Sequence, residues 1–323
     1  DCLLSRGLGD VYKRQVLSFN SCKDDDTTEG TSPAVTEAVP LQLTGLTIRE
    51  STAESLDAAT SRVSANKWDV NDQIGVFMLQ DGTYNIAAEA SNKAYFTESG
   101  DGKFLPLPME GIDNTLYLPA DGSYMDIVAY YPYKELTDNV LSVDITDQSN
   151  QAALDLMRGT PDKLAYNNTN PQADLTFRRK MSQIVITMQA GDGVDETELQ
   201  GTQIQLEGFH STGSFDPIRD KLVIGENLSS VNLLVAEDGK SAMGIVLPED
   251  EAAQRKLVIR AGYNLNGVPF TYDISEEQTF LPGRSYNFSV TFFRERIEVS
   301  TSITDWVDGG KTEGAIIDDS DSL

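Results

Sequence analysis

Side chains that commonly carry out catalysis or bind metal ions are scarce in this chain. Its 323 residues include one histidine, His210, and two cysteines, Cys2 and Cys22. A zinc site built from histidine and cysteine is therefore nearly impossible, and a serine–histidine–aspartate triad would have to use His210. The 51 acidic residues could supply two carboxylates for glycoside hydrolysis, but no spacing singles out a pair. We predict no enzymatic activity, no metal site and no cofactor.

Acidic residues dominate the charge of the chain. The 25 lysines and arginines oppose 51 aspartates and glutamates, so the formal net charge is −26. Nucleic-acid binding and adhesion to anionic lipid through a basic face both need a surplus of positive charge, which argues against both kinds of partner. With 39% hydrophobic residues the chain can still build a core. The composition favours an acidic binding or structural protein outside the cytoplasm.

The first residues of the chain have the character of a foreign leader. Asp10–Gln15 is the hexapeptide that the mosaic end of a sequencing-library transposon adapter would encode. We therefore interpret residues 1–15 as an adapter artefact and exclude them from the fold. The alternative is a genuine polar amino terminus.

The next segment resembles the end of a lipoprotein signal. Val16–Ser21 runs from apolar to small or polar residues and precedes Cys22, as in a lipobox whose cysteine becomes diacylated. Phe19 and Asn20 depart from the usual lipobox residues. Lys23 and three aspartates follow, then a polar stretch to Ala38, which suits a solvated tether. We predict a signal remnant and acidic tether over residues 16–38, lipidation at Cys22 and attachment to the outer membrane. The alternative is a merely disordered tail.

Beyond the tether, the chain has the pattern of an all-β protein. Short runs rich in β-branched and aromatic residues alternate with glycine, aspartate, asparagine and proline, and Ser149–Met157 alone suggests two helical turns. We expect two tandem antiparallel β-sandwiches, over residues 39–170 and 171–323. The expected strands are Val39–Ile48, Gln73–Leu79, Thr115–Leu118, Asp126–Tyr131, Val140–Ile145, Leu175–Met188, Gln203–Phe209, Val231–Val235, Ala242–Leu247, Lys256–Tyr263, Val268–Ile274, Ser285–Phe293 and Ile297–Ile303.

Five motifs along the chain carry a family resemblance. They are Trp68–Phe77, Ile127–Tyr133, Asp147–Ser149 with Asp155–Met157, Leu175–Ser182, and Leu281–Phe288 with Ile303–Trp306. In this order they resemble the fimbrillin family of Bacteroidetes, in its Mfa-like branch, over about residues 39–310. Arg179 stands where the family usually has histidine.

The resemblance implies a structural role at the cell surface. Such proteins are subunits of type V pili, each with two transthyretin-like sandwiches, and they polymerise by strand exchange after a protease removes their first strand. The implied partners are other fimbrial subunits, with a host or bacterial surface ligand as a further candidate.

The residues can be set against that mechanism. Val39, Leu41 and Leu43 alternate, and Gly45 then shifts the phase to Leu46 and Ile48, which predicts a first strand with one apolar face and a bulge. Arg49 and Arg62 flank a polar segment and are the candidate cleavage sites for a trypsin-like protease. If the strand is never cut, it simply completes the sandwich, as in an anchor or accessory subunit.

The carboxyl-terminal part offers a candidate donor strand. Ile297, Val299 and Ile303 alternate on one face, and Ile316 and Ile317 follow later. Trp68 and Trp306 are expected to be structural core residues.

A second hypothesis is a monomeric surface lipoprotein. It would bind a glycan or a host ligand through exposed aromatic rings such as Tyr130, Tyr133 or Tyr263. His210 is expected to be an ordinary loop histidine.

Overall fold

The structure, a computed structural model, describes residues 38–47, 68–161, 165–250, 254–264 and 266–306. These residues form strands and three short 3-10 helices, which confirms the all-β prediction. None of the helices in the described ranges is long and apolar enough to cross a membrane. In place of two helical turns over Ser149–Met157, the structure has one three-residue 3-10 helix, capped by Asn150.

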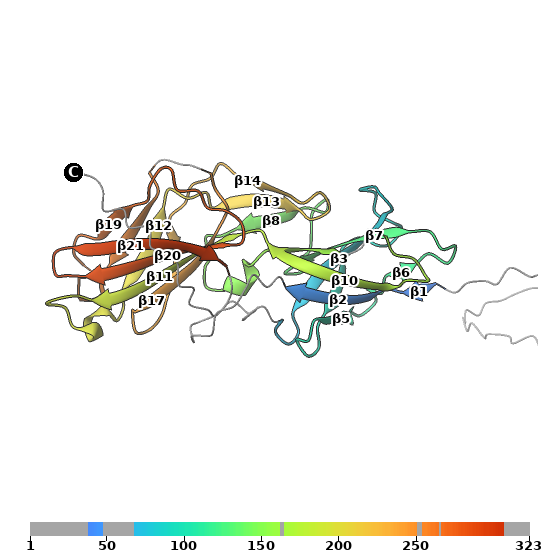
Figure 1. The fold of residues 1–323 in the computed structure, drawn as a ribbon, viewed down its shortest axis with the longest axis horizontal. Coiled ribbons are helices and arrows are strands. Elements are labelled where there is room, and N and C mark those ends of the chain that lie inside the picture. Colours follow the sequence, from blue (N-terminus) through green and yellow to red (C-terminus); the bar gives the residue numbers. More distant parts are fainter. Residues whose placement is uncertain (1–37, 48–67, 162–164, 251–253, 265, 307–323) are drawn as a thin grey trace, which may run out of the picture. The chain divides into compact units, whose positions relative to one another are not determined.

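Seven strands in the amino-terminal half close into a barrel (Figure 1). In the order of their pairing they are β10 (Gln172–Arg179), β2 (Gln42–Thr47), β5 (Lys103–Pro106), β4 (Lys93–Phe96), β3 (Gln73–Gln80), β7 (Met125–Tyr131) and β9 (Met157–Pro161). The sequence suggested an open two-sheet sandwich here. The sheet closes because β10 pairs with β9 on one side and, in parallel, with β2 on the other. Beside the barrel, β1 (Val39–Pro40) pairs with β6 (Tyr117–Leu118).

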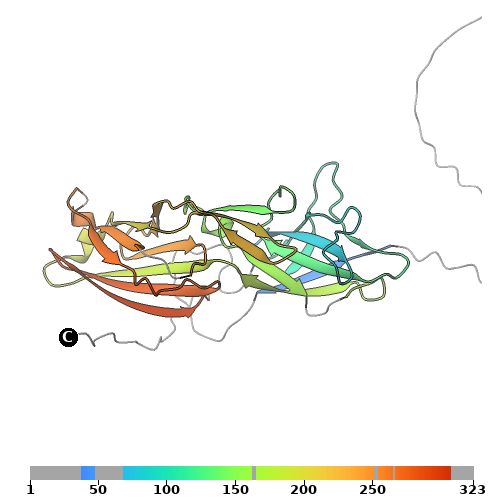
Figure 2. The same ribbon diagram turned by 90° about the horizontal axis from the view of Figure 1, so that it is seen from above.

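Three further sheets contain the remaining strands. The five-stranded sheet is β16 (Leu234–Val235), β17 (Ser241–Val246), β11 (Ser182–Ala190), β20 (Arg284–Phe292) and β21 (Ile297–Asp305). The four-stranded sheet is β15 (Val231–Asn232), β12 (Gln203–Glu207), β18 (Lys256–Arg260) and β19 (Phe270–Asp273), and the three-stranded sheet is β14 (Lys221–Ile224), β13 (Thr212–Asp216) and β8 (Leu141–Asp144). The 3-10 helices are η2 (Gln151–Ala153), η3 (Glu196–Leu199) and η4 (Gly262–Asn264). The red strands β20 and β21 lie side by side in both views (Figures 1 and 2).

Two hydrophobic cores share the strands β3 and β7. Successive side chains of a strand point to opposite faces, so Ile74 and Val76 pack inside the barrel while Phe77 and Leu79 join the second core.

Strand pairing crosses the predicted domain boundary at residue 170 in both directions. The strand β10, which follows residue 170, belongs to the barrel, and β8, which precedes it, pairs with β13. The division of the chain at residue 170 stays a prediction.

Candidate functional site

The first long strand of the barrel, β2, is held along both of its edges. Its residues Gln42–Thr47 lie opposite Gln172–Phe177 of β10, and on the other side Leu43 and Thr44 pair with β5. The amide of Gly45 donates to the carbonyl of Gly102 at 2.7 Å. A strand with two neighbours has hydrogen-bonding partners on both sides, and its removal would leave one edge of each neighbour unpaired.

The apolar side chains of this segment enter the barrel core. Leu41 and Leu43 are each 4% exposed and pack among Trp68, Phe104 and Phe177. Val39 lies in β1 and is half-buried, and Leu46 lies in β2 opposite Thr176. Ile48, the last residue predicted for this strand, lies outside the described residues, as do Arg49 and Arg62.

Gly45 does not produce the bulge that the sequence suggested. The pairing with β10 runs residue for residue from Gln42 to Thr47, so Gly45 stays in phase with Leu43 and faces the core. A Cβ atom at Gly45 would lie 2.7 Å from Phe104 Cε2 and 3.0 Å from Phe177 Cε2. The prediction of a bulge was wrong because the glycine makes room for two aromatic rings, which occupy the space of its missing side chain.

Trp68 ties these rings to the backbone of β2. Its indole Nε1 donates to the carbonyl of Gly45 at 2.8 Å, and its ring meets Phe104 and Phe177 edge-on, each at 5.0 Å between centroids. Tyr131 packs on Trp68 at 5.4 Å, and its hydroxyl lies 3.2 Å from Asp72 Oδ1. Burial, assisted by the nearby carboxylates, raises the pKa of the Tyr131 phenol. The core around Gly45 is therefore aromatic and closely packed.

The candidate donor strand, β21, lies at the edge of its sheet. It pairs with β20 along its whole length, from Ile297 opposite Phe292 to Asp305 opposite Arg284, and this is its one sheet neighbour among the described strands. Ile297 and Val299 are half-buried against the second core, whereas Ile303 is 53% exposed. Ile316 and Ile317 lie outside the described residues.

Trp306 follows β21 and is the last residue that the structure describes. It is 4% exposed, and its amide donates to the carbonyl of Gly283 at 2.8 Å. The Arg179 guanidinium lies 4.6 Å from the centre of its ring and donates to its carbonyl at 3.3 Å. Trp306 is thus held at the end of β10, the strand that closes the barrel.

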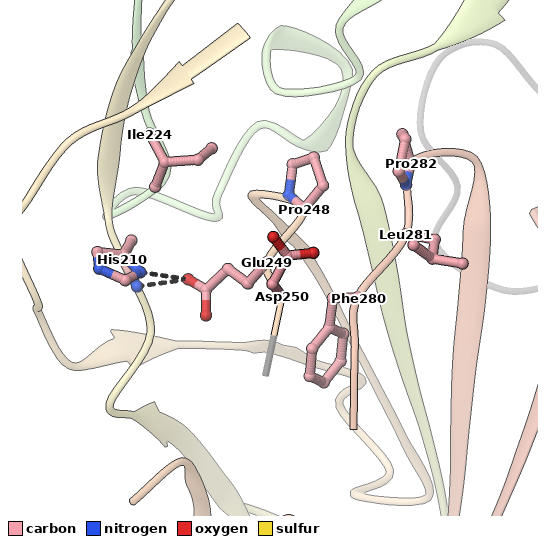
Figure 3. A pocket seen from close by; sticks show the side chains of 8 residues that line it. All are labelled: His210, Ile224, Pro248, Glu249, Asp250, Phe280, Leu281 and Pro282. Carbon is pink, nitrogen blue, oxygen red and sulfur yellow. Dashed lines mark hydrogen bonds and ion pairs between the residues drawn. The ribbon is translucent and has the colours of Figure 1, made fainter. Parts of the chain in front are cut away.

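A cavity of about 320 Å³ lies in the carboxyl-terminal half, lined by residues that include His210, Glu249 and Phe280 (Figure 3). Glu249 accepts a hydrogen bond from the His210 amide at 2.6 Å and lies 3.1 Å from its Nδ1. Burial raises the pKa of the Glu249 carboxyl and lowers that of the neighbouring Arg255 guanidinium. Among the described lining residues there is no serine, cysteine or lysine that could act as a nucleophile, and His210 holds its loop to Glu249. In the described ranges, no group of three or more His, Cys, Asp or Glu side chains could hold a metal ion.

Comparison with known proteins identifies the group to which this arrangement belongs. The profile of the fimbrillin-like family matches residues 61–306, which is most of the chain. The chain belongs to the fimbrillin-like family. The resemblance drawn from the five motifs is thereby confirmed.

Two kinds of relative support the assignment. The "Putative fimbrium subunit Fim1C" of Bacteroides uniformis is 28% identical over 263 residues, covering 77% of this chain and 82% of that protein. The crystal structure of "a putative cell adhesion protein" from Bacteroides uniformis has a TM-score of 0.68 at 26% identity and covers 83% of this chain and 98% of that chain. A structure with the same description from Bacteroides ovatus shares the fold, with a TM-score of 0.64 at 21% identity over 84% of this chain and 99% of that one.

This fimbrillin-like chain uses Arg179 as a structural cation. Its Nε donates to Asp155 Oδ1 at 3.0 Å and its Nη2 to Oδ2 at 3.1 Å, and the two side chains are 7% and 0% exposed. Such a two-pronged pair is strong when desolvated and costly to break. Arg179 and Asp155 belong to two separate motifs of the sequence, and nothing in the spacing showed that they meet.

Tyr130 is not available as an exposed aromatic ligand platform. It is 0% exposed, and its hydroxyl donates to Asn92 or Lys134 at 2.8 and 2.7 Å. Burial raises the pKa of this phenol as well. That part of the ligand-binding hypothesis was wrong because β7 is covered on both faces. Tyr133 and Tyr263 are half-buried, and the Tyr263 hydroxyl donates to the Phe293 carbonyl.

Proposed function

We propose that this fimbrillin-like chain is a structural subunit of a cell-surface fimbria, exported as a lipoprotein and assembled by protease-triggered strand exchange. Family membership supports the fimbrial role, and the described relatives are a fimbrium subunit and cell adhesion proteins. The observation that carries the mechanism is the placement of β2. It is an amino-terminal strand, buried between two partners, whose chain continues directly into the segment that contains Arg49 and Arg62.

Removal of the first strand would create an acceptor groove. Cleavage at Arg49 or Arg62 would separate β2 from the rest of the barrel, and with it any lipid on Cys22. The groove would expose the edges of β10 and β5 and the sites of Leu41 and Leu43. Burial of two leucine side chains is worth about 3–6 kcal/mol, so an empty groove favours a replacement strand.

A strand from another subunit would fill the groove by β-augmentation. Backbone hydrogen bonds to β10 and β5 would supply affinity, and alternate apolar side chains would supply specificity. The donor strand would come from the carboxyl-terminal part of another subunit. In this chain the corresponding candidate donor residues are Ile297, Val299, Ile303, Ile316 and Ile317. Because donor and acceptor are different surfaces, the contact is heterologous and extends into a fibre. Within the fibre, each subunit would consist of two tandem transthyretin-like sandwich domains, residues 39–170 and residues 171–323.

Limited trypsin digestion tests this proposal. We expect cleavage first at Arg49 or Arg62, followed by SDS-resistant oligomers on a gel when other fimbrial subunits are present. The triple variant Arg49→Ala, Arg62→Ala and Lys67→Ala, which removes every trypsin site between β2 and Trp68, should stay monomeric under the same conditions. Arg296→Ala, which changes an exposed arginine in the β20–β21 turn, is the matched control and should still assemble. An uncut first strand with persistent monomers, at trypsin levels that digest an unfolded standard, would refute the exchange mechanism.

A further inference from the structure

The groove occupied by β2 has an unusual requirement at one position. The inward-facing positions of this segment are Leu41, Leu43 and Gly45, and the first two are filled by leucine side chains. At the third, any Cβ would come within 2.7 Å of Phe104, closer than Cβ atoms approach other heavy atoms. An occupant of this groove therefore needs two apolar residues and then a residue without a side chain.

The rings at Gly45 cannot easily withdraw. Phe104 and Phe177 both pack edge-on against Trp68, whose indole is in turn anchored on the Gly45 carbonyl. Phe104 and Phe177 are 3% and 1% exposed, so a displaced ring would have to enter a filled core. The strand also runs close to β5 here, because a Cβ on Gly102 would lie 2.5 Å from the Gly45 carbonyl oxygen. Two independent contacts thus fix the backbone of the occupant at this point.

We propose that the groove selects a strand with the pattern apolar, any, apolar, any, glycine, and that this strand comes from a different subunit and not from a second copy of this chain. The proposal rests on the strand-exchange function above. It adds which partner the groove accepts.

Residues 297–323 of this chain lack the pattern. With Ile297 and Val299 in the two leucine positions, Thr301 would fall on the glycine position and meet the rings. The glycines of residues 297–323 are Gly309, Gly310 and Gly314. The pattern requires apolar residues two and four positions from the glycine on the same side. Neither before nor after any of these three glycines are both positions apolar. The chain therefore donates to a groove of another shape and receives from another sequence.

Peptide exchange tests this selectivity on the full chain after trypsin treatment. The probes are three fluorescent peptides: Ala38–Thr47 of this chain, the same peptide with Gly45→Val, and Ile297–Trp306. None contains lysine or arginine, so all three resist trypsin. Fluorescence anisotropy should show binding of the first peptide and at least roughly tenfold weaker binding of the other two.

The outcomes of this experiment distinguish the selectivity of the groove, the identity of the partner and strand exchange itself. Equal binding of all three peptides overturns the selectivity while leaving strand exchange intact. Binding of Ile297–Trp306 at the strength of the native peptide overturns the claim of a different partner subunit. Binding of none refutes strand exchange itself, and the inference falls with it.

The steric basis can be tested separately in the uncut protein. Gly45→Ala should lower the midpoint of urea unfolding, because the methyl group has no space between the two rings. Thr44→Ala is the matched control, since it changes the neighbouring residue on the opposite face of the same strand. Equal midpoints for the two variants would overturn the glycine requirement without touching the proposed function.

Discussion

The strands β2 and β21 differ in how many neighbouring strands they pair with and in how deeply their side chains are buried. β2 has a hydrogen-bonded neighbour on each side and an inward face among aromatic rings. β21 has one neighbour, and its Ile303 is more than half exposed. A strand enclosed in this way leaves a specific groove when it is removed, whereas removal of an edge strand breaks its pairing with one neighbour only. Under the proposed exchange mechanism, the barrel would be the acceptor and the edge of the five-stranded sheet would be the donor.

The largest effect is expected where the end of β21 meets the barrel. Arg179→Met would leave the Asp155 carboxylate buried without its partner, which typically costs about 3–5 kcal/mol of unfolding free energy. Arg296→Met, which breaks an exposed pair with Glu298, should cost about 0–1 kcal/mol. Urea unfolding measures both. Similar losses for the two variants would contradict a structural role for the Arg179 pair.

A slightly smaller effect is expected inside the barrel. Leu43→Ala should destabilise the protein by about 2–5 kcal/mol, because the substitution leaves an empty space among packed aromatic rings. The corresponding change on the edge strand, Ile303→Ala, should stay within about 0.5 kcal/mol. Thermal or urea unfolding distinguishes them. If Ile303→Ala were as damaging as Leu43→Ala, β21 would not be an edge strand in solution.

Trp68→Phe isolates the hydrogen bond that fixes β2. The Gly45 carbonyl would lose its indole donor, at a cost of about 1–3 kcal/mol, while most of the aromatic packing remains. Trypsin should then cut between residues 49 and 62 and release the first strand faster than in the parent protein. An unchanged release rate would show that the indole does not retain β2.

The smallest effect concerns exchange of backbone amides. Because β2 is paired on both sides, its amides should exchange with deuterium more slowly than the outward-facing amides of β21. Mass spectrometry of peptides from the two strands measures this without any substitution. Faster exchange in β2 would mean that the barrel opens spontaneously and needs no protease.

Local patterns found most of the long strands, since alternation and turn residues are properties of neighbouring positions. β3, β7, β20 and β21 match the expected segments closely. The short strands β4, β5 and β9 were missed because their few residues include lysine, arginine, glycine or proline and almost no β-branched side chain. Leu175–Met188 was expected as one strand, but it is β10 and β11, and the break at Lys180 and Met181 lets the chain pass from the barrel to the next sheet.

The sequence by itself determined the all-β class, the family and the apolar residues of the first strand, because periodicity and short motifs are written in consecutive residues. Tertiary structure alone decided that the first sheet closes, that Arg179 meets Asp155, and that Gly45 faces Phe104 and Phe177. Each of these joins residues more than twenty positions apart. Such contacts depend on which strands pair, and strand pairing is settled by burial and hydrogen bonding over the whole fold.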